Sequence, residues 1–328
     1  MPRIKVPRYY LENPFEFAEC LRYNETPFTL TSTSFTKKIE VDGEIYYFTS
    51  SGKLKNTDLN LIKAVKNYCE KLVTDQFDDA GNLIKEGLKI PAVDTSKIGY
   101  IKVNTKFKNA IHKRDIFEID LKSAYWNLAY RHGFIDKKIY YKGMNLNDDG
   151  TVIEPLFNKW GNIYNHTTKM GRLIALGNLA KVFKVFSFDG LKYSDPQDVR
   201  SFKTENIFFR CSMEVDLIMR QLIELAGSNY LFYWVDAIFV RGSETVDLIC
   251  EFLTNEIGLD FKIVPIKKLV KTPYYIKVWD ETNLNKKGDM VPRPYIFKSL
   301  PKHRLDEVLD IASDSMSFSD NMRKFLNK

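Results

Sequence analysis

The sequence predicts an α+β protein whose main sheet is antiparallel and is backed by helices on one face. Two observations support this fold class. Short apolar runs typical of strands alternate with amphipathic runs typical of helices between about residues 116 and 279. With 328 residues, 44% of them apolar and 28% charged, the chain also has the length for two ordinary domains and the composition of a globular protein.

Residues 1–110 are expected to form a separate N-terminal α+β region of unknown role. Strand-like runs occur over 38–49 and are interrupted by Asp42-Gly43, a dipeptide that favours a hairpin turn. Apolar residues at helical spacing then predict a helix over 58–73, with Thr57 as its N-cap.

Residues 111–280 are expected to form the main domain, with an insertion at about 133–190. The first strand, 117–121, ends near an aspartate and leads into a helix. The insertion begins as an irregular segment and becomes a basic amphipathic helix over 167–186. The other predicted elements are helices at 123–132, 212–226 and 243–257, the last capped by Ser243 and ended by Gly258, and strands at 230–241, 261–266 and 274–279.

Residues 281–328 are expected to form a turn-rich tail that ends in a weakly helical segment around Leu305 to Ile311. The formal charge of +7 is a mild excess that favours a polyanionic partner. The four cysteines are scattered, without metal-finger spacing, which indicates reduced thiols and a cytoplasmic location. No apolar run follows the basic N-terminus, so neither a signal peptide nor a membrane anchor is expected.

Two aspartates lie within apolar, strand-like runs: Asp120 in FEIDL and Asp236 in YLFYWVDAIFV. Burying a carboxylate in such a run costs several kcal/mol unless a cation or hydrogen-bond donors compensate it. A single aspartate of this kind is well explained by a nearby turn or by a Lys or Arg partner. For two, a shared pair of Mg²⁺ ions is the better explanation, because hard divalent ions prefer carboxylate and carbonyl oxygens.

The segment Asp120-Leu121-Lys122-Ser123-Ala124-Tyr125 resembles motif A of the family B DNA polymerases, D-x-x-S-x-Y. The resemblance implies a polymerase palm in which Asp120 and the backbone carbonyl of Leu121 hold metal. It also implies that the Ser123 and Ala124 amides contact the triphosphate and that Tyr125 lies under the deoxyribose. A core aromatic is the alternative reading of Tyr125.

The segment Trp234-Val235-Asp236-Ala237 resembles the end of motif C of the same family, D-x-D. Asp236 takes the position of the second aspartate, which in the family is the principal metal ligand. Trp234 replaces the first aspartate. The resemblance therefore implies a metal site at Asp236 with altered metal affinity or primer positioning.

Two further segments match the family loosely. The basic helix takes the place of motif B and the fingers, so the resemblance implies nucleotide contacts from Lys169, Arg172 and Asn178. Lys268, Lys271 and Tyr274 resemble the family's K-x-Y element and imply contacts with the primer or nucleic-acid backbone. A solvated charged face and a surface lysine cluster are the alternatives.

Taken together, the motifs imply a DNA polymerase or nucleotidyltransferase that uses two Mg²⁺ (or Mn²⁺) ions to add dNTPs to a 3′-OH or to a protein-primer hydroxyl. DNA primer–template and dNTPs would be its ligands. The palm would span 111–280 with short helical fingers, and 281–328 would form a reduced thumb. The first 115 residues are too short for a proofreading exonuclease. Low processivity would then call for a processivity or priming partner, as in small polymerases of viruses or mobile elements acting in the host cytoplasm.

Other functions also fit the sequence. A primase-like or template-independent nucleotidyltransferase would use the same two carboxylates, whereas a reverse transcriptase would carry two adjacent aspartates in place of Asp236-Ala237. A catalytically degenerate palm would bind nucleic acid or a partner protein, and Trp234 favours this alternative. A structural interaction protein would pair its buried aspartates internally. The template type, the primer type and the oligomeric state are left open by the sequence.

Overall fold

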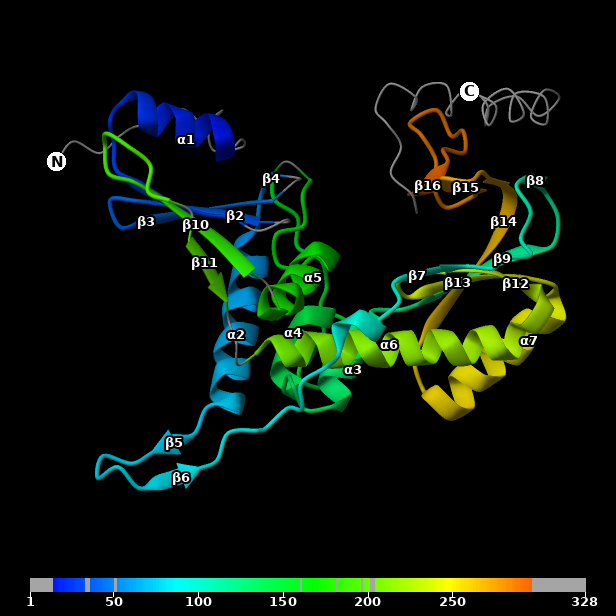
Figure 1. Cartoon of the computed structure of the whole chain (residues 1–328), viewed down its shortest axis with the longest axis horizontal. Coiled ribbons are helices and arrows are strands. Elements are labelled where there is room, and N and C mark those ends of the chain that lie inside the picture. Colours follow the sequence, from blue (N-terminus) through cyan, green and yellow to red (C-terminus); the bar gives the residue numbers. More distant parts are fainter. Residues whose placement is uncertain are drawn as a thin grey trace. The chain divides into compact units, whose positions relative to one another are not determined.

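The computed structural model describes residues 14–32, 36–49, 52–159, 161–180, 182–195, 197–200 and 204–296. The chain divides into two compact units (Figure 1). The first takes its described residues from Met1–Val93 and Tyr125–Cys211, and the second takes them from Asp94–Ala124 and Ser212–Lys328. Both units combine helices with antiparallel strands, so the predicted α+β class is confirmed.

The first unit contains a sheet of six strands in the order β11-β10-β1-β2-β3-β4. Apolar side chains such as Phe28, Ile39 and Phe48 form its core with Phe17 of α1 (Pro14–Tyr23). The predicted turn at Asp42-Gly43 is confirmed, because both residues have positive φ and join β2 to β3. The strands are β1 (Phe28–Ser32), β2 (Thr36–Val41), β3 (Glu44–Thr49), β4 (Gly52–Lys53), β10 (Val182–Phe188) and β11 (Gln197–Arg200).

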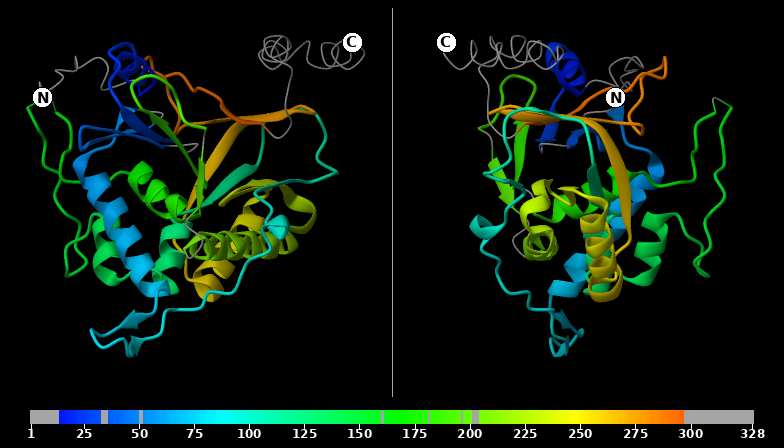
Figure 2. Two further views of the ribbon diagram at one scale, coloured as in Figure 1. Left: turned by 60° about the vertical axis from the view of Figure 1, so that its left-hand side comes forward. Right: turned by 90° about the vertical axis from the view of Figure 1, so that its right-hand side faces the viewer.

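The helices of the first unit are centred on α2 (Asn56–Val73), which packs against α4 (Lys137–Met144) and α5 (Lys169–Gly177). The helix predicted over 58–73 is therefore confirmed. Its predicted N-cap is wrong, because Lys55 holds that position and the Thr57 hydroxyl donates to the carbonyl of His166 instead. Beyond the C-terminal end of α2, β5 (Gln76–Phe77) and β6 (Leu83–Lys85) form a small hairpin (Figures 1 and 2).

The basic helix predicted over 167–186 is wrong in its second half. After α5, a short 3₁₀ turn, Asn178–Ala180, leads into β10, which pairs with β1. The sequence of β10, VFKVFSF, is β-branched and aromatic, a composition that favours a strand over a helix. Lys184 therefore belongs to a strand of the first unit's sheet.

The second unit contains a sheet in the order β16-β15-β14-β9-β13-β12-β7, with β8 paired to β14, and every pairing is antiparallel. The sheet curls along β14 (Figure 2). The strands are β7 (Ile101–Val103), β8 (Ile111–His112), β9 (Ile116–Leu121), β12 (Tyr230–Trp234), β13 (Ala237–Arg241), β14 (Phe261–Lys271), β15 (Tyr275–Asp280) and β16 (Arg293–Ile296).

Two helices lie on one face of this sheet (Figure 1). The helix α6 (Glu205–Ala226) crosses the unit boundary, and its Asp216 accepts a hydrogen bond from Tyr233 of β12. The helix α7 (Ser243–Phe252) contacts β9 and β13 and continues as a π-helical turn to Ile257. The antiparallel sheet backed by helices agrees with the prediction. None of the helices in the described ranges combines the length and apolar composition needed to cross a membrane.

Several predicted boundaries in this unit are corrected. The strand predicted over 230–241 is a hairpin, β12 and β13 joined by a turn at Val235 and Asp236. Ser243 makes no capping bond, although Gly258 does end the helix in the left-handed conformation. The segment predicted as a tail contributes β16 to the sheet. The weak helix predicted near Leu305 lies outside the described residues.

Candidate functional site

Asp120 and Asp236 belong to neighbouring backbone segments of the second unit. Asp120 on β9 lies directly opposite Ala237 of β13. The pairing continues beyond the strand end, where the Leu121 amide donates to the Asp236 carbonyl at 3.0 Å. Directly opposite residues of an antiparallel pair have Cα atoms about 4.5–5.5 Å apart. Two carboxylate-bearing residues therefore lie at the same end of adjacent strands.

The β12–β13 turn holds Asp236 through an unusual backbone conformation at Val235. Val235 has φ 56°, in the left-handed region that β-branched residues rarely adopt. Its amide donates a 2.7 Å hydrogen bond to the carbonyl of Tyr100, which fixes the turn from outside the hairpin. A backbone conformation of this kind costs about 1–3 kcal/mol and persists where the surroundings impose it.

The strand-to-helix connection after Asp120 has a second left-handed residue. Ser123 has φ 51°, and the next residue begins α3 (Ala124–Arg131). The preceding amide, of Lys122, donates to the carbonyl of Asp260 at 2.8 Å. The chain therefore turns sharply between the end of β9 and the first turn of α3. The unit boundary falls after Ala124, so Tyr125 is counted with the first unit.

The fully buried carboxylate of FEIDL is Glu118 and not Asp120. Glu118 is 4% exposed, whereas Asp120 and Asp236 are both partly exposed. Arg293 of β16 compensates this burial, donating from Nη1 to Glu118 Oε1 at 3.0 Å and contacting Oε2 through Nη2. The cost of burying a carboxylate on β9 therefore falls on Glu118, and this carboxylate is compensated by a cation of the same chain.

The Arg293 guanidinium also binds a second buried carboxylate, Asp280 at the end of β15. Arg293 Nε donates to Asp280 Oδ2 at 2.8 Å, and the Asp280 side chain is fully buried. Burial alone would raise the pKa of Asp280, but hydrogen bonds from Thr282 and Arg293 bring it below its usual value. Burial alone would lower the pKa of Arg293, but its bonds with Glu118 raise it. Asp280 and Arg293 are therefore both charged at neutral pH.

Trp234, which precedes the β12–β13 turn, packs against the apolar core of the sheet. Its ring meets the ring of Tyr295 edge to face, with centroids 5.3 Å apart. Tyr295 also contacts Phe232 and Phe239 and accepts a hydrogen bond from Arg293 Nη1 at 2.8 Å. Burial, together with nearby carboxylates that include Glu118 and Asp120, raises the pKa of Tyr295. Trp234 therefore belongs to an aromatic cluster beside the β12–β13 turn.

Sequence reasoning missed three residues near Asp120. Lys262 of β14 is the direct cross-strand partner of Asp120 and is exposed. Glu118 precedes Asp120 by two residues, a spacing that places both on one face of β9, so this signal was present in the sequence. Arg293 lies more than 170 residues later in an apparently irregular tail, and nothing in its local sequence indicates its partners.

The predicted nucleotide contacts on α5 belong to the first unit. Lys169 is exposed at the first position of α5. The Arg172 guanidinium is half-buried and donates to the Gly143 carbonyl at 2.8 Å, and burial lowers its pKa despite the nearby charge of Asp58. Asn178 lies at the C-cap of α5, and its Oδ1 is buried without a hydrogen-bond partner within the described residues.

Tyr125 stacks on an aromatic ring of the same unit. Its ring lies nearly parallel to that of Phe208 on α6, with centroids 5.7 Å apart, and it is partly exposed. The predicted primer contacts belong to the second unit. Lys268 Nζ lies over the Trp279 ring, and Lys271 donates to Asn109 Oδ1 at 2.7 Å. Tyr274 donates its amide to the Thr272 hydroxyl in the β14–β15 turn.

The donor set at Asp120 and Asp236 is compatible with Mg²⁺. Mg²⁺ in proteins is typically bound by one or two carboxylates, with water and substrate phosphates completing its coordination. Within the described ranges, no group of three His, Cys, Asp or Glu side chains could hold a metal ion on its own. Asp120 and Asp236 could thus provide the protein part of such a site only together with water, backbone or substrate oxygens.

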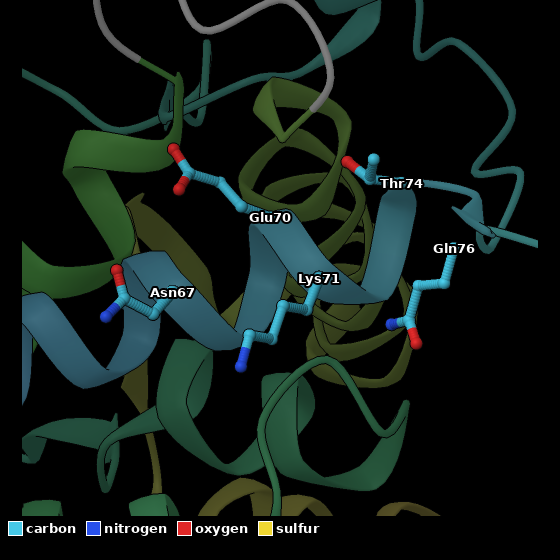
Figure 3. A pocket seen from close by; sticks show the side chains of 5 residues that line it. All are labelled: Asn67, Glu70, Lys71, Thr74 and Gln76. Atoms are coloured by element: carbon cyan, nitrogen blue, oxygen red, sulfur yellow. The ribbon is translucent and has the colours of Figure 1, made fainter. Parts of the chain in front are cut away.

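A pocket lies in the first unit at the C-terminal end of α2 (Figure 3). It is lined by Asn67, Glu70, Lys71, Thr74 and Gln76. None of the residues predicted from sequence motifs lines this pocket. The candidate site at Asp120 and Asp236 lies in the second unit, at the end of β9 and the start of β13.

Comparisons with known proteins give matches among solved structures only. No protein-family model matches the chain, and a search of curated protein sequences gives no match. Among solved structures, the chain is similar to the family B DNA polymerase from the hyperthermophilic archaeon Pyrobaculum calidifontis, with a TM-score of 0.33 and 10% sequence identity. The alignment covers 83% of this chain and 38% of that chain, so this chain spans well under half of the polymerase.

Proposed function

We propose that the second unit carries a nucleotidyl-transfer centre of the polymerase type, with Asp120 and Asp236 as its metal-binding residues. The observation that supports this most is the pairing of β9 with the β12–β13 turn, which places both aspartates at one end of the sheet. Each aspartate is partly exposed, so a ligand can reach it from solvent. Both flanking connections adopt left-handed backbone conformations of the kind found at functional sites.

The reaction is the attack of a primer hydroxyl on the α-phosphorus of a dNTP. The new bond joins this oxygen to the α-phosphorus, the bond to the β-phosphate oxygen breaks, pyrophosphate leaves, and the hydroxyl proton passes to solvent. Bound Mg²⁺ or Mn²⁺ ions would lower the pKa of the attacking hydroxyl and neutralise charge on the phosphates. Asp120, the Leu121 carbonyl and Asp236 would hold these ions.

The other motif residues have supporting roles in this proposal. The Ser123 and Ala124 amides would bind the triphosphate, and Tyr125 would lie against the sugar, where its ring leaves no space for a 2′-hydroxyl. Lys169, Arg172 and Asn178 would contact the nucleotide. Lys268, Lys271 and Tyr274 would contact the nucleic-acid backbone without reading bases. A guanidinium has five N–H donors, so the Arg172 bond to the Gly143 carbonyl is compatible with a phosphate contact.

The alternative is a degenerate palm that binds nucleic acid or a partner protein without catalysis. One observation favours it: Trp234 is packed against Tyr295 at the position where the family has a further carboxylate. This alternative predicts nucleic-acid binding that does not depend on divalent ions and that survives replacement of Asp236.

A nucleotide-incorporation assay separates these functions. The parent chain would be incubated with labelled dNTPs or NTPs and Mg²⁺ or Mn²⁺. The arms would contain a primed DNA template, a primed RNA template, a primer alone or a template alone. Extension on primed DNA supports the polymerase, extension without template supports a template-independent transferase, and products from template alone support a primase-like activity. Binding without incorporation in any arm would favour the degenerate palm.

A further inference from the structure

The edge strand β16 reaches back across the curled sheet to the strand that carries Asp120. Two strands, β15 and β14, lie between β16 and β9 in the sheet order. Nevertheless Arg293 of β16 contacts Glu118 of β9 through both Nη atoms. The sheet curls along β14 (Figure 2), so a residue of the edge strand can contact a residue of β9 across two intervening strands.

Arg293 is fully engaged by its neighbours. It donates to Glu118, to Asp280 at 2.8 Å and to the Tyr295 hydroxyl at 2.8 Å, and Nη2 also lies 2.6 Å from Asp280. The planar guanidinium meets each carboxylate with a pair of nitrogens, a geometry that a lysine ammonium cannot reproduce. Since both carboxylates are almost completely buried, this geometry fixes their positions and that of Arg293.

This arrangement bears directly on Asp120. Glu118 and Asp120 are two residues apart on β9, so they lie on the same face of the strand. The Tyr295 ring packs edge to face against Trp234, beside the β12–β13 turn. Arg293 and Tyr295 thus contact the neighbours of both aspartates, on β9 and on β12.

We propose that Arg293 and Tyr295 are positioning residues, which hold Asp120 and the β12–β13 turn in the geometry that binds a divalent cation. This inference rests on the proposed function, because it concerns the same metal site. Replacing a group that contacts and orients metal ligands, without touching the metal itself, typically weakens metal binding by about 10–100-fold. The segment predicted from sequence to be a thumb or tail would then contribute to the metal site of the palm.

The test measures Mn²⁺ binding without nucleotide, by electron paramagnetic resonance of the free ion, in the parent, Arg293→Lys and Tyr295→Phe. Arg293→Lys keeps the charge but loses the paired geometry, and we expect about tenfold weaker Mn²⁺ binding. Tyr295→Phe removes only a hydroxyl and leaves both carboxylates bound to Arg293, so it folds even if the lysine variant does not. It is expected to weaken Mn²⁺ binding severalfold.

Arg220→Lys provides the matched control. Arg220 Nε donates to Asp216 Oδ2 at 2.8 Å, and this carboxylate is also buried and bound by a tyrosine hydroxyl, from Tyr233. The pair lies on α6. Within the described residues its other hydrogen bonds go to Tyr233 of β12 and to the backbone of Gly99 and Lys97, not to β9 or to the turn residues Val235 and Asp236. Arg220→Lys should therefore lower the melting temperature without changing Mn²⁺ binding.

Each outcome decides the question. Weaker Mn²⁺ binding in Arg293→Lys or Tyr295→Phe, with Arg220→Lys unchanged, supports the positioning role. Parent-like Mn²⁺ binding in Tyr295→Phe and in any folded Arg293→Lys overturns the inference while leaving the proposed function intact. A parent that binds no Mn²⁺ overturns the metal site itself, and with it both proposals.

Discussion

Leu121 donates its amide hydrogen to the carbonyl of Asp236, and this hydrogen bond joins the end of β9 to the β12–β13 turn. Asp120 immediately precedes the donor, so the relative position of the two aspartates depends on the turn as much as on the strand. The conformation of this turn depends on Val235, whose backbone lies in the left-handed region and whose amide donates a hydrogen bond to the Tyr100 carbonyl. The strain at Val235 can therefore be tested by measuring the free energy of unfolding, without an activity assay.

Replacing Val235 by Asn should stabilise the protein. Asn tolerates positive φ better than a β-branched residue does, so part of a strain of about 1–3 kcal/mol is relieved. Allowing for the lost apolar contact, we expect the free energy of unfolding in urea to rise by about 0.5–1 kcal/mol. Val152→Asn, at an exposed position with no such strain, is the control. An unchanged or lower urea midpoint for Val235→Asn would contradict the strained turn.

Replacing Trp234 by Asp, the residue that motif C of the family B DNA polymerases has at the corresponding position, should destabilise the protein. The substitution removes the ring that packs against Tyr295 and puts a carboxylate in its place. For a half-buried ring the expected loss is about 2–3 kcal/mol in urea unfolding. Trp234→Phe keeps an aromatic ring and should lose less than half as much. Equal stability of Trp234→Asp and the parent would mean that Trp234 is not part of the core.

Gly171→Ala should destabilise the first unit through a clash with Asp58. A Cβ at position 171 would lie 2.1 Å from Asp58 Oδ1, the oxygen that accepts the Thr168 amide at the N-terminus of α5. Overpacking of this kind costs about 1–3 kcal/mol, more than the helix propensity gained from alanine. Leu173→Ala, at an exposed site on the same helix, should cost less than about 0.5 kcal/mol. Thermal unfolding of both variants measures the difference.

Acid should destabilise the protein partly through Asp280. Its pKa in the folded state lies below the value of about 3.9 of an unfolded aspartate. The folded state therefore binds fewer protons, and the stability that Asp280 contributes is present above about pH 4 and lost as the pH falls through the folded pKa. Asp280→Asn should be less stable at neutral pH and lose less stability between about pH 5 and 2. Urea midpoints over this range that run parallel to those of the exposed control Asp247→Asn would contradict the assignment.

The sequence predicted the elements whose periodicity is long or whose ends carry a clear signal. The helix predicted over 58–73 and the end of a helix at Gly258 are examples. Amphipathic spacing and a left-handed glycine are both local features of the sequence. The β12–β13 turn was missed because Val235 occupies a position where Gly or Asn normally marks a turn. The second half of the basic helix was missed because β10 is stabilised by its partner β1, more than 140 residues away.

In the candidate site, too, local features could be predicted from the sequence and long-range contacts could not. Asp120 and Asp236 were found because each lies in an apolar run, yet the carboxylate that the core buries is Glu118. Its partner, Arg293, is brought to it by the curl of the sheet, which no local pattern encodes. The position of Lys262 opposite Asp120 likewise depends on strand register and could not be read from spacing. Long-range pairing therefore accounts for most of what the sequence did not predict.

Nucleotide incorporation by Asp120→Asn and Asp236→Asn is the most direct test of the proposed centre. Each variant keeps the shape of the side chain but removes the charge that a divalent ion needs, at a loss of several kcal/mol of transition-state stabilisation. We expect incorporation on primed DNA to fall by more than about a hundredfold in each. Asp247→Asn, on α7 of the same unit, should retain parental activity. Equal incorporation by the parent and by Asp236→Asn would contradict the proposal.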